Sequence, residues 1–475
     1  MALVCGIDSS TQSTKVELRD LDRGELVAGA AAPHPATEPP VSEQDPEAWW
    51  SALVSSLGVL GDHLGEVAAV AIAGQQHGLV LVDGAGEVIR PAKLWNDTTS
   101  APQADALVAE LGSDGWARSC GSVPVAAFTV TKLAWIAEHE PDALARAARV
   151  MLPHDYLTWR LTGEHVTDRG DASGTGWWSP ASGSYDDALV ELAVGGAGRW
   201  DGERPRVVGP AEAVGPVTAD VGLPAGAVVA AGTGDNMGAA LGLGLRPGDV
   251  VMSLGTSGTV FAVSEQPTAD ASGFVAGFAD ATGRYLPLVC TLNATKVTDA
   301  AGRWLGLGRD ELAARALDAS PGGPVLVPYL DGERTPNLPD ATGVLVGLRT
   351  STTPADLARA AHLGVVCGLL DGVDALAAVD VPLDGRRFLV GGGSKSPAYR
   401  QLVADTWGAV TVPDLDETVA TGAAVQAAVV ASGRTFEEVV AAWGLGSGQL
   451  TEPRADADPA GAGSAYAEAR GSLAG

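Results

Sequence analysis

The sequence contains three segments whose residue types could bind a nucleotide, two of them its phosphates and the third its nucleoside. The first is GIDSSTQSTKVEL, residues 6–18, in which an apolar strand stops at Asp8 and is followed by hydroxyl side chains and Lys15. Backbone N–H groups and hydroxyls in a tight turn suit phosphate oxygens, and a nearby carboxylate suits a magnesium ion. The pattern therefore predicts a phosphate-binding hairpin. An ordinary β-turn rich in Ser and Thr is the alternative.

A second segment repeats this plan halfway along the chain. In GDVVMSLGTSGTVFAVS, residues 248–264, an apolar strand, a Gly/Ser/Thr turn and another apolar strand follow one another. Two such hairpins predict two related α/β domains that each open with one. We place the boundary near residues 244–247 and expect domains over 1–244 and 245–475, with phosphates held between the two hairpins. A chance similarity between two short segments is the alternative.

The third segment, RFLVGGGSKSPAYRQL, joins a short apolar strand to an amphipathic helix through Gly391, Gly392 and Gly393. Because glycines have no side chain, they would let a flat nucleoside approach the backbone closely. A generic strand-to-helix turn explains the three glycines equally well. The segment is not GxGxxG, and no lysine stands in a GxxxxGK[ST] arrangement, so neither a dinucleotide fingerprint nor a P-loop is supported.

Length, composition and charge limit the classes of function. At 475 residues the chain is long enough for two or three domains that enclose a cleft. A formal charge of −28 disfavours nucleic acid and membrane surfaces as partners. We read the apolar residues as dispersed in short runs, and the N-terminus lacks a signal-peptide pattern, so we expect a cytoplasmic protein without a membrane span. Four distant cysteines without CxxC predict buried thiols.

Further motifs occur in order along nearly the whole chain, and they are AIAGQQHGLVLVD, PAKLWND, LPHDYLTWRLTGE, AGTGDNMGAALGLG and PYLDGERTPN. Together with the three segments above, they resemble the FGGY family of carbohydrate kinases, in the superfamily of sugar kinases, actin and Hsp70. The resemblance implies two ribonuclease H-like α/β domains with an interdomain cleft in which ATP and a sugar meet. Within the family, the motifs are most similar to those of bacterial enzymes that phosphorylate D-xylulose.

The resemblance assigns the chemistry to two aspartates. The family's catalytic base falls on Asp235 in GTGDNMG, beside Asn236, which would orient the sugar, and its magnesium-organising aspartate falls on Asp8. A carboxylate at Asp235 could take the proton that a sugar hydroxyl loses as it accepts the γ-phosphoryl group of ATP. A helix cap is the alternative for Asp235. The positive end of the following helix should hold this carboxylate ionised.

The resemblance also implies the residues that contact phosphates and adenosine. These are Thr11, Ser13 and Lys15 of the first hairpin, Gly255 and Thr256 of the second, and Gly392 and Gly393 of the third segment. Ser10 stands where the family usually has Gly, and its added hydroxyl should leave the phosphate function intact.

Sugar recognition is implied for Gln76 and His77 in GQQHG. Relatives that act on D-xylulose usually have Met at the first position, and an amide there could add a hydroxyl contact or alter the preferred sugar. A purely structural role is the alternative for His77. Trp95, Trp177 and Trp178 lie near polar turns where an indole could pack on a sugar, although Trp is more often core.

We therefore expect ATP- and Mg²⁺-dependent conversion of D-xylulose to D-xylulose 5-phosphate. Ribulose, another ketose or a polyol is the alternative acceptor, and a nucleotide-dependent binding module is the alternative from another class. A homodimer is one option, because the sequence does not decide the oligomeric state. After Leu450 the sequence becomes rich in Ala, Gly, Asp and Glu, which predicts a loosely held C-terminal segment.

Overall fold

Residues 2–471 are described by the computed structural model, and they fold as two units. The first unit contains the chain up to Leu245 together with Glu265–Leu286 and Glu417–Gly446. The second contains Arg246–Ser264, Pro287–Asp416 and the residues from Ser447 onward.

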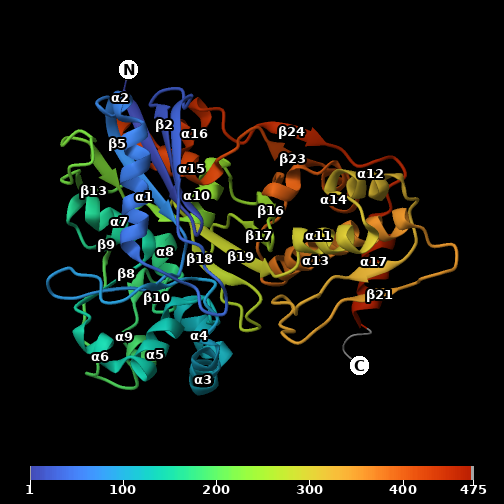
Figure 1. Ribbon diagram of the computed structural model, residues 1–475, viewed down its shortest axis with the longest axis horizontal. Helices are drawn as coiled ribbons and strands as arrows, with labels where there is room; N and C mark the ends of the chain where they lie inside the picture. The colour runs from blue at the N-terminus through green and yellow to red at the C-terminus, as the bar shows by residue number, and fades with distance from the viewer. Residues whose placement is uncertain (1, 472–475) are drawn as a thin grey trace. The chain divides into compact units, whose positions relative to one another are not determined.

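A seven-stranded sheet forms the centre of the first unit (Figure 1). Its strands are β1 (Leu3–Ser9), β2 (Ser13–Asp20), β3 (Leu26–Pro33), β5 (Val67–Gly74), β13 (Ala213–Pro216), β14 (Val228–Ala230) and β15 (Thr233–Gly234). They run in the order β13-β14-β5-β1-β2-β3, and β15 pairs with β5. β1 is antiparallel to β2 and parallel to β5. Both β1 and β5 are mostly apolar because helices cover the sheet on both faces.

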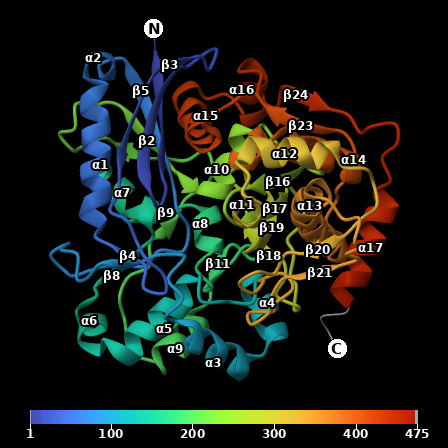
Figure 2. The same ribbon diagram turned by 45° about the vertical axis from the view of Figure 1, so that its right-hand side comes forward.

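The helices that cover this sheet are α1 (Pro46–Val59), α10 (Asp235–Gly242) and α15 (Thr418–Ser432). Figure 2 shows α1 on one side of the strands and α15, next to α10, on the other. A Cβ on Gly6 of β1 would come within 2.0 Å of the carbonyl oxygen of Ala420 in α15. A Cβ on Gly242 or Gly422 would meet the backbone of the neighbouring helix at 1.9 Å. This close packing explains why a helix from the C-terminal half of the sequence belongs to the first unit.

The first unit has further short strands and helices beside its sheet. They are β4 (Glu43–Gln44), α2 (Gly61–Leu64), β6 (Val80–Val82), β7 (Ala92–Lys93), α3 (Ala101–Leu111), α4 (Ser113–Cys120), α5 (Thr129–His139), α6 (Pro141–Arg146), β8 (Arg149–Met151), α7 (Pro153–Thr162), β9 (Val166–Thr167), α8 (Arg169–Ser173), β10 (Trp178–Ser179), β11 (Ser184–Tyr185), α9 (Asp187–Val194), β12 (Arg206–Val207), β18 (Ala276–Ala279) and α16 (Phe436–Ala442). Two of them, α7 and α8, pack against β5 and β15 respectively.

The second unit repeats the strand plan of the first. Six of the seven strands of its sheet run in the order β19-β17-β16-β22-β23-β24, and β18 is the seventh. The six are β16 (Val250–Leu254), β17 (Gly258–Ala262), β19 (Tyr285–Thr291), β22 (Arg387–Val390), β23 (Val410–Pro413) and β24 (Gly448–Thr451). β16 is antiparallel to β17 and parallel to β22, just as β1 is to β2 and β5. The prediction of two related α/β domains that each open with a hairpin is therefore confirmed.

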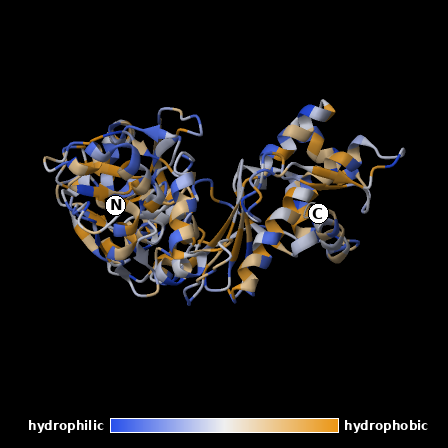
Figure 3. Cartoon of the chain, turned by 90° about the horizontal axis from the view of Figure 1, so that it is seen from below, coloured by the Kyte–Doolittle hydropathy of each residue, from blue (hydrophilic) through white to orange (hydrophobic). Residues whose placement is uncertain are grey.

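Helices pack around the second sheet, and Figure 3 shows hydrophobic segments along helices and strands of both units. The helices of the second unit are α11 (Thr295–Leu305), α12 (Arg309–Asp318), α13 (Pro354–Ala378), α14 (Pro397–Trp407) and α17 (Pro459–Gly471). This unit also contains the short strands β20 (Val325–Val327) and β21 (Val344–Val346). In α17, Tyr466 and Ala469 are buried and Arg470 pairs with Asp371 at 2.5 Å. The prediction of a loosely held C-terminal segment was wrong for this helix.

One helix of the described chain, α13, is long and apolar enough to cross a membrane by length and composition alone. The sequence prediction of only short apolar runs was therefore wrong for α13. Of its most apolar stretch, 56% is buried inside the protein. Core helices pass the same test, and α13 packs between α11, α12, α14 and β20 as such a helix does.

The two units do not correspond to two continuous halves of the chain. The first crossing, after Leu245, lies one residue from the predicted limit of 1–244, but Glu265–Leu286 and Glu417–Gly446 return to the first unit. The first return carries β18, which packs on α8, and the second carries α15. No disulfide links the described cysteines, and Cys5, Cys120 and Cys367 are buried while Cys290 is half-buried.

Candidate active site

The candidate catalytic residues lie at the carboxyl ends of neighbouring strands in the first unit. β1 ends directly after Asp8, and Gln76 follows the end of β5. On one side of β5, Ala73 pairs with Asp8, and on the other side it pairs with Thr233 of β15. Because the three strands run parallel, their carboxyl ends bring Asp8, Gln76 and Asp235 to one edge of the sheet.

A chain of hydrogen bonds links the predicted base to the predicted sugar-binding residues. Asp235 Oδ1 accepts hydrogen bonds from the backbone N–H of Asn236 at 2.7 Å and from its side-chain Nδ2 at 2.9 Å. The same Nδ2 donates to Gln76 Oε1 at 3.1 Å. Gln76 is buried, and within the described residues its Nε2 has no hydrogen-bond partner. The structure thus brings Asp235, Asn236 and Gln76 together, with an amide donor of Gln76 available beside them.

Burial controls the charge of Asp235. Gly234 is the N-cap of α10, and the Asp235 carboxylate bonds to the adjacent Asn236 instead of capping the helix turn. Burial raises the pKa of Asp235 to about 7, and Asp8 acts in the same direction, against the lowering effect of the Asn236 hydrogen bonds. The expectation that the helix end holds this carboxylate ionised therefore fails below about pH 7 because desolvation outweighs the helix field. A pKa near neutrality suits a general base.

His77 is held in one orientation beside Gln76. Its backbone has φ of 67°, which is uncommon for a residue other than glycine. Nδ1 donates to the carbonyl oxygen of Gly174 at 2.7 Å, and the ring stacks on Phe128 with centroids 5.0 Å apart. The Nδ1 contact places the ring proton on Nδ1 and makes Nε2 the acceptor nitrogen. The contacts with Gly174 and Phe128 are those expected if His77 had a purely structural role. The same contacts also fix the direction in which Nε2 points.

The charges of the first hairpin form a network with a residue from far along the chain. Lys15 Nζ donates to Glu417 Oε2 at 2.7 Å and lies 4.0 Å from Asp8 Oδ2. Burial raises the pKa of Asp8 to about 7, while Lys15 lowers it. Among the described residues, Asp8 Oδ1 has no hydrogen-bond partner. Mg²⁺ prefers carboxylate oxygens as ligands, so the Asp8 oxygen without a partner is suited to bind the predicted magnesium ion.

Thr11 and Ser13 shape the first hairpin in different ways. Thr11 Oγ1 donates to Gln75 Oε1 at 3.1 Å and accepts from Trp95 Nε1 at 2.9 Å. This hydroxyl therefore ties the hairpin to the loop after β5. Ser13 opens β2, and its carbonyl oxygen accepts from the Ser10 N–H at 3.0 Å and the Ser10 hydroxyl at 3.1 Å. The serine that departs from the family pattern thus closes the turn.

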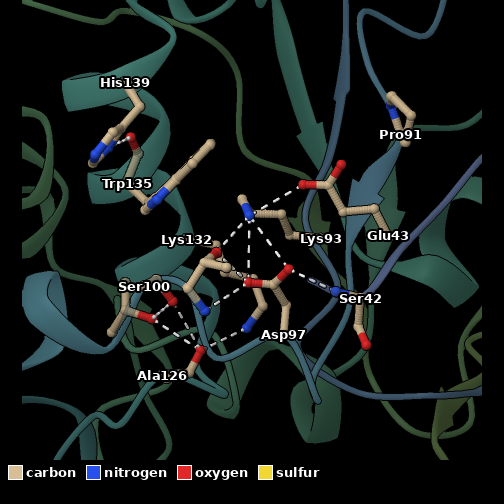
Figure 4. Close-up of polar contacts among 12 residues, drawn as sticks. Ser42, Glu43, Pro91, Lys93, Asp97, Ser100, Ala126, Lys132, Trp135 and His139 are labelled. Carbon is tan, nitrogen blue, oxygen red and sulfur yellow. Dashed lines mark hydrogen bonds and ion pairs between the residues drawn. The ribbon is translucent and has the colours of Figure 1, made fainter. Parts of the chain in front are cut away.

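Buried charges brace the loop that carries Trp95. Figure 4 shows Lys93 facing Asp97, with Nζ and Oδ1 3.3 Å apart, and Glu43, whose Oε1 lies 3.1 Å from the same Nζ. Asp97 Oδ2 accepts the backbone N–H of Ser42 at 2.9 Å. Asp97 and Lys93 are almost wholly buried, so their charges satisfy one another and hold the loop in place.

The second hairpin lies in the second unit and is fastened to the start of α11. The Gly255 N–H donates to the Ser257 carbonyl oxygen at 3.0 Å, which closes the turn between β16 and β17. The Gly255 carbonyl oxygen accepts from the N–H and the hydroxyl of Thr295 at 3.0 and 2.9 Å. Thr256 is exposed, and its carbonyl oxygen accepts the Ala294 N–H at 3.3 Å. These bonds leave the turn's exposed face to a ligand.

The glycines after β22 pack against this same hairpin. A Cβ on Gly391, which has φ of 83°, would come within 2.7 Å of the Leu254 carbonyl oxygen, and a Cβ on Gly393 would meet the Leu254 side chain at 2.7 Å. Gly392 is exposed, with no other heavy atom within 4 Å of where its Cβ would stand. The two segments predicted to bind the nucleotide therefore lie together in this unit. The open backbone at Gly392 fits the close approach of a nucleoside.

Known proteins match the chain over nearly its whole length. Residues 3–242 match the N-terminal domain, and residues 250–431 the C-terminal domain, of the FGGY family of carbohydrate kinases. The chain belongs to this family. It is 50% identical over 455 residues to the xylulose kinase of Streptomyces rubiginosus, over 95% of this chain and 92% of that protein. The xylulose kinase of Streptomyces coelicolor is 49% identical over the same shares. The crystal structure of xylulose kinase from Bifidobacterium adolescentis superposes with a TM-score of 0.88 at 41% identity, over 99% of each chain.

Two features of this FGGY kinase could not be located by its motifs. Glu417 precedes α15 directly, and an acid at a helix start is so common that nothing singles it out as the partner of Lys15. Of the three tryptophans considered for sugar stacking, Trp177 and Trp178 are buried, whereas Trp95 is 41% exposed. Burial depends on tertiary packing, which the local sequence around a Trp does not encode.

Proposed function

We propose that this protein transfers the γ-phosphoryl group of ATP to the terminal hydroxyl of D-xylulose, giving D-xylulose 5-phosphate and ADP. The names of its relatives support the sugar, since two are xylulose kinases at 50% and 49% identity. The observation that carries the proposal is the hydrogen-bonded chain from Asp235 through Asn236 to Gln76. It sets a carboxylate with a near-neutral pKa beside amide groups that suit sugar hydroxyls.

Asp235 is proposed as the general base. It accepts the proton of the sugar hydroxyl as the hydroxyl oxygen bonds to the γ-phosphorus and the bond from that phosphorus to the ADP oxygen breaks. Asn236 holds the Asp235 carboxylate through Oδ1, which leaves Oδ2 for the hydroxyl. Gln76 Nε2 and His77 Nε2 are proposed to donate to and accept from other hydroxyls of the sugar, respectively.

The phosphates and the metal are proposed to engage residues of both hairpins. Asp8 would hold Mg²⁺ or its bound water, and the ion would supply charge neutralisation to the phosphates. We propose Lys15 and the backbone around Thr11 and Ser13 as phosphate contacts in the first unit. In the second unit, Gly255 and Thr256 would bind phosphates, and Gly392 and Gly393 would contact adenosine. Thr256 and Gly392 are exposed and Gly255 is half-buried, whereas Gly393 is buried and packs against Leu254.

An acceptor panel tests the proposed reaction. ADP release should be measured with D-xylulose, ribulose, hexoses and polyols, and the sugar phosphate should be identified by mass spectrometry. We expect kcat/KM for D-xylulose to exceed that for every other acceptor by at least about tenfold. A clear preference for another acceptor would overturn the sugar assignment. ATP turnover without any sugar phosphate would instead favour the nucleotide-dependent binding module.

We further propose a cytoplasmic enzyme, which agrees with four unlinked thiols and with the need for ATP. Fractionation of the source cells with an antibody against the protein tests this location. Whether the enzyme is a homodimer is a separate proposal that light scattering of the pure protein decides.

A further inference from the structure

A buried histidine surrounded by three carboxylates lies behind the candidate site. His154 is the second residue of α7 and is fully buried, as is Asp171 of α8. His154 Nδ1 lies 2.5 Å from Asp171 Oδ2. On the opposite side of the ring, Nε2 lies 3.4 Å from Asp155 Oδ1 and 3.9 Å from Asp168 Oδ1. The motif LPHDYL gave no reason to expect these contacts.

Charge balance favours a protonated imidazole at this position. Isolated carboxylates are very costly to bury, and the only cationic partner within reach of these three in the described chain is His154. Burial by itself lowers the pKa of His154, but Asp155, Asp171 and Asp168 together raise it to about 10. The three acids thus favour a positive charge on the ring, and the charged ring in turn stabilises the ionised forms of these acids, whose pKa values burial raises.

Metal binding explains the cluster less well. Ligand atoms bound tetrahedrally to a metal at about 2.1 Å lie about 3.4 Å from each other. The 2.5 Å separation of His154 Nδ1 and Asp171 Oδ2 is that of a short hydrogen bond between the two groups. The pair is thus already joined directly, without an ion between them.

The cluster touches both chain segments that carry the candidate site. A Cβ on Gly74, at the end of β5 before Gln76, would meet the His154 Cβ at 3.0 Å. A Cβ on Gly232, before β15, would meet the His154 ring at 2.8 Å. His154 therefore packs directly against both segments, with its Cβ and backbone against the one that leads to Gln76 and its ring against the one that leads to Asp235. Neither glycine can carry a side chain without displacing His154.

Hydrogen bonds continue this contact into the turn before Asp235. Thr233 Oγ1 donates to Asp168 Oδ2 at 2.9 Å, and Asp168 Oδ1 accepts the Asp171 N–H at 3.0 Å. A Cβ on Gly234 would meet Asp171 Oδ1 at 2.9 Å and the Gln76 side chain at 2.7 Å. The residues on either side of the cluster are thus held to the His154 ring and to one another.

We propose that His154 is a positioning residue of the phosphoryl-transfer site, whose positive charge holds Asp168 and Asp171 against the Thr233–Gly234 turn and so sets the placement of Asp235 and Gln76. This inference rests on the proposed function of Asp235 and Gln76. The cluster contains none of the residues proposed to contact the sugar, so His154 acts through Asp235 and Gln76.

Three variants of the full-length protein test the role of the charge. His154→Gln removes the cation, and His154→Lys keeps one. His165→Gln alters a histidine of the same unit whose Nε2 bonds to the Val150 carbonyl oxygen at 2.9 Å, away from the cluster. We expect His154→Gln to lower kcat/KM for the best sugar by at least about tenfold, with KM for ATP within about twofold. His154→Lys should recover a large part of this loss, and His165→Gln should stay near the native value.

The outcomes separate positioning from simple packing. If Lys and Gln at position 154 give the same kcat/KM, or if His154→Gln changes only the melting temperature, the proposal is overturned. Should His154→Gln fail to fold, Thr233→Val removes the link to Asp168 with little change in volume, and it should lower kcat/KM severalfold while KM for ATP stays constant. An unchanged kcat/KM in Thr233→Val would likewise overturn the proposal.

Two controls keep other failures distinct. If the native protein phosphorylates no sugar, the proposed function itself is wrong. That result is obtained before any variant is compared. Native protein dialysed against EDTA and resupplied with Mg²⁺ should regain full activity. A loss restored by Zn²⁺ but not by Mg²⁺ would show a metal in the cluster and would overturn the role of the imidazolium.

Discussion

Replacing Asp235 by Asn should abolish most catalysis and, at the same time, stabilise the free protein above neutral pH. The two side chains have nearly the same shape, so the contacts to Asn236 can largely be kept. Asn cannot accept the proton of the sugar hydroxyl, and we expect kcat to fall by about 10²–10⁴-fold with the sugar still bound. The variant should be more stable because Asn carries no charge, and the cost of burying the Asp235 carboxylate is therefore removed.

The size of this gain can be worked out from the pKa. Asp235 has a pKa of about 7 in the folded protein, against an ordinary value of 3.8. Because the folded pKa is raised, the stability contributed by this group is fully present below pH 3.8 and is lost as the pH rises to about 7. The full loss is at most about 4 kcal/mol, since one pH unit corresponds to about 1.4 kcal/mol. By surface area Asp235 is only half-buried, so solvent screening reduces this loss, and we expect Asn to regain about 1–2 kcal/mol of stability above pH 7.

Thermal unfolding of the native and Asp235→Asn proteins at about pH 5 and about pH 8 measures this effect. The melting temperature of the variant should be higher by about 2–6 °C at pH 8, with a clearly smaller difference at pH 5. Asp62→Asn, which changes an exposed aspartate of the same unit, should leave kcat unaltered. An equal difference at both pH values, or a less stable variant at pH 8, would show that desolvation does not set the charge of Asp235. A kcat within tenfold of the native value would refute its role as base.

Four further predictions follow from the site. The kcat/KM of the native enzyme should fall as the pH drops through about 7, because Asp235 must be ionised to act; a flat profile down to about pH 5 would contradict this. Asp8→Asn should lower kcat by about 10²-fold or more and raise the Mg²⁺ concentration for half-maximal rate, as a magnesium titration would reveal; an unchanged requirement would exclude Asp8 from the metal site. Gln76→Met should raise KM for the sugar severalfold and leave KM for ATP constant, which initial-rate kinetics would test; the reverse pattern would remove Gln76 from the sugar site. Gly393→Val should raise KM for ATP at least about tenfold, because the new side chain meets Leu254, while calorimetric binding of D-xylulose stays normal; weaker sugar binding would point to a wider disturbance.

The strand plan of both units could be predicted because its signals are local. Apolar runs that end in Gly/Ser/Thr turns specify hairpins, and the same signal at residues 6–18 and 248–264 gave the repeat. The motif around Asp235 likewise identified a strand end followed by a helix, and the structure places Asn236 and Gln76 beside it. Such residues adjoin strand ends, so their neighbours in space follow from the sheet order.

Features that depend on distant packing could not be predicted. The pKa of Asp235 is controlled by burial, which overrides the local effect of the helix end. Lys15 is paired with Glu417, which lies outside every motif that was recognised. The charge cluster around His154 needs α7, α8 and the turn before α10 to be folded together, and no single one of these segments contains enough information to indicate it.

Because α15 belongs to the first unit, its position in the sequence determines which fragments of this enzyme could fold on their own. A polypeptide that stops at residue 244 would keep every strand of the first sheet and lose the helix that packs on β1 and β5. The backbone at Gly6 and Gly242 would then lose the helix that packs closely on it, and Lys15 would lose its hydrogen-bonded partner Glu417. Expression of a self-sufficient sugar-binding fragment would therefore require residues 417–446 to be joined back by a linker, in an order that differs from that of the natural chain.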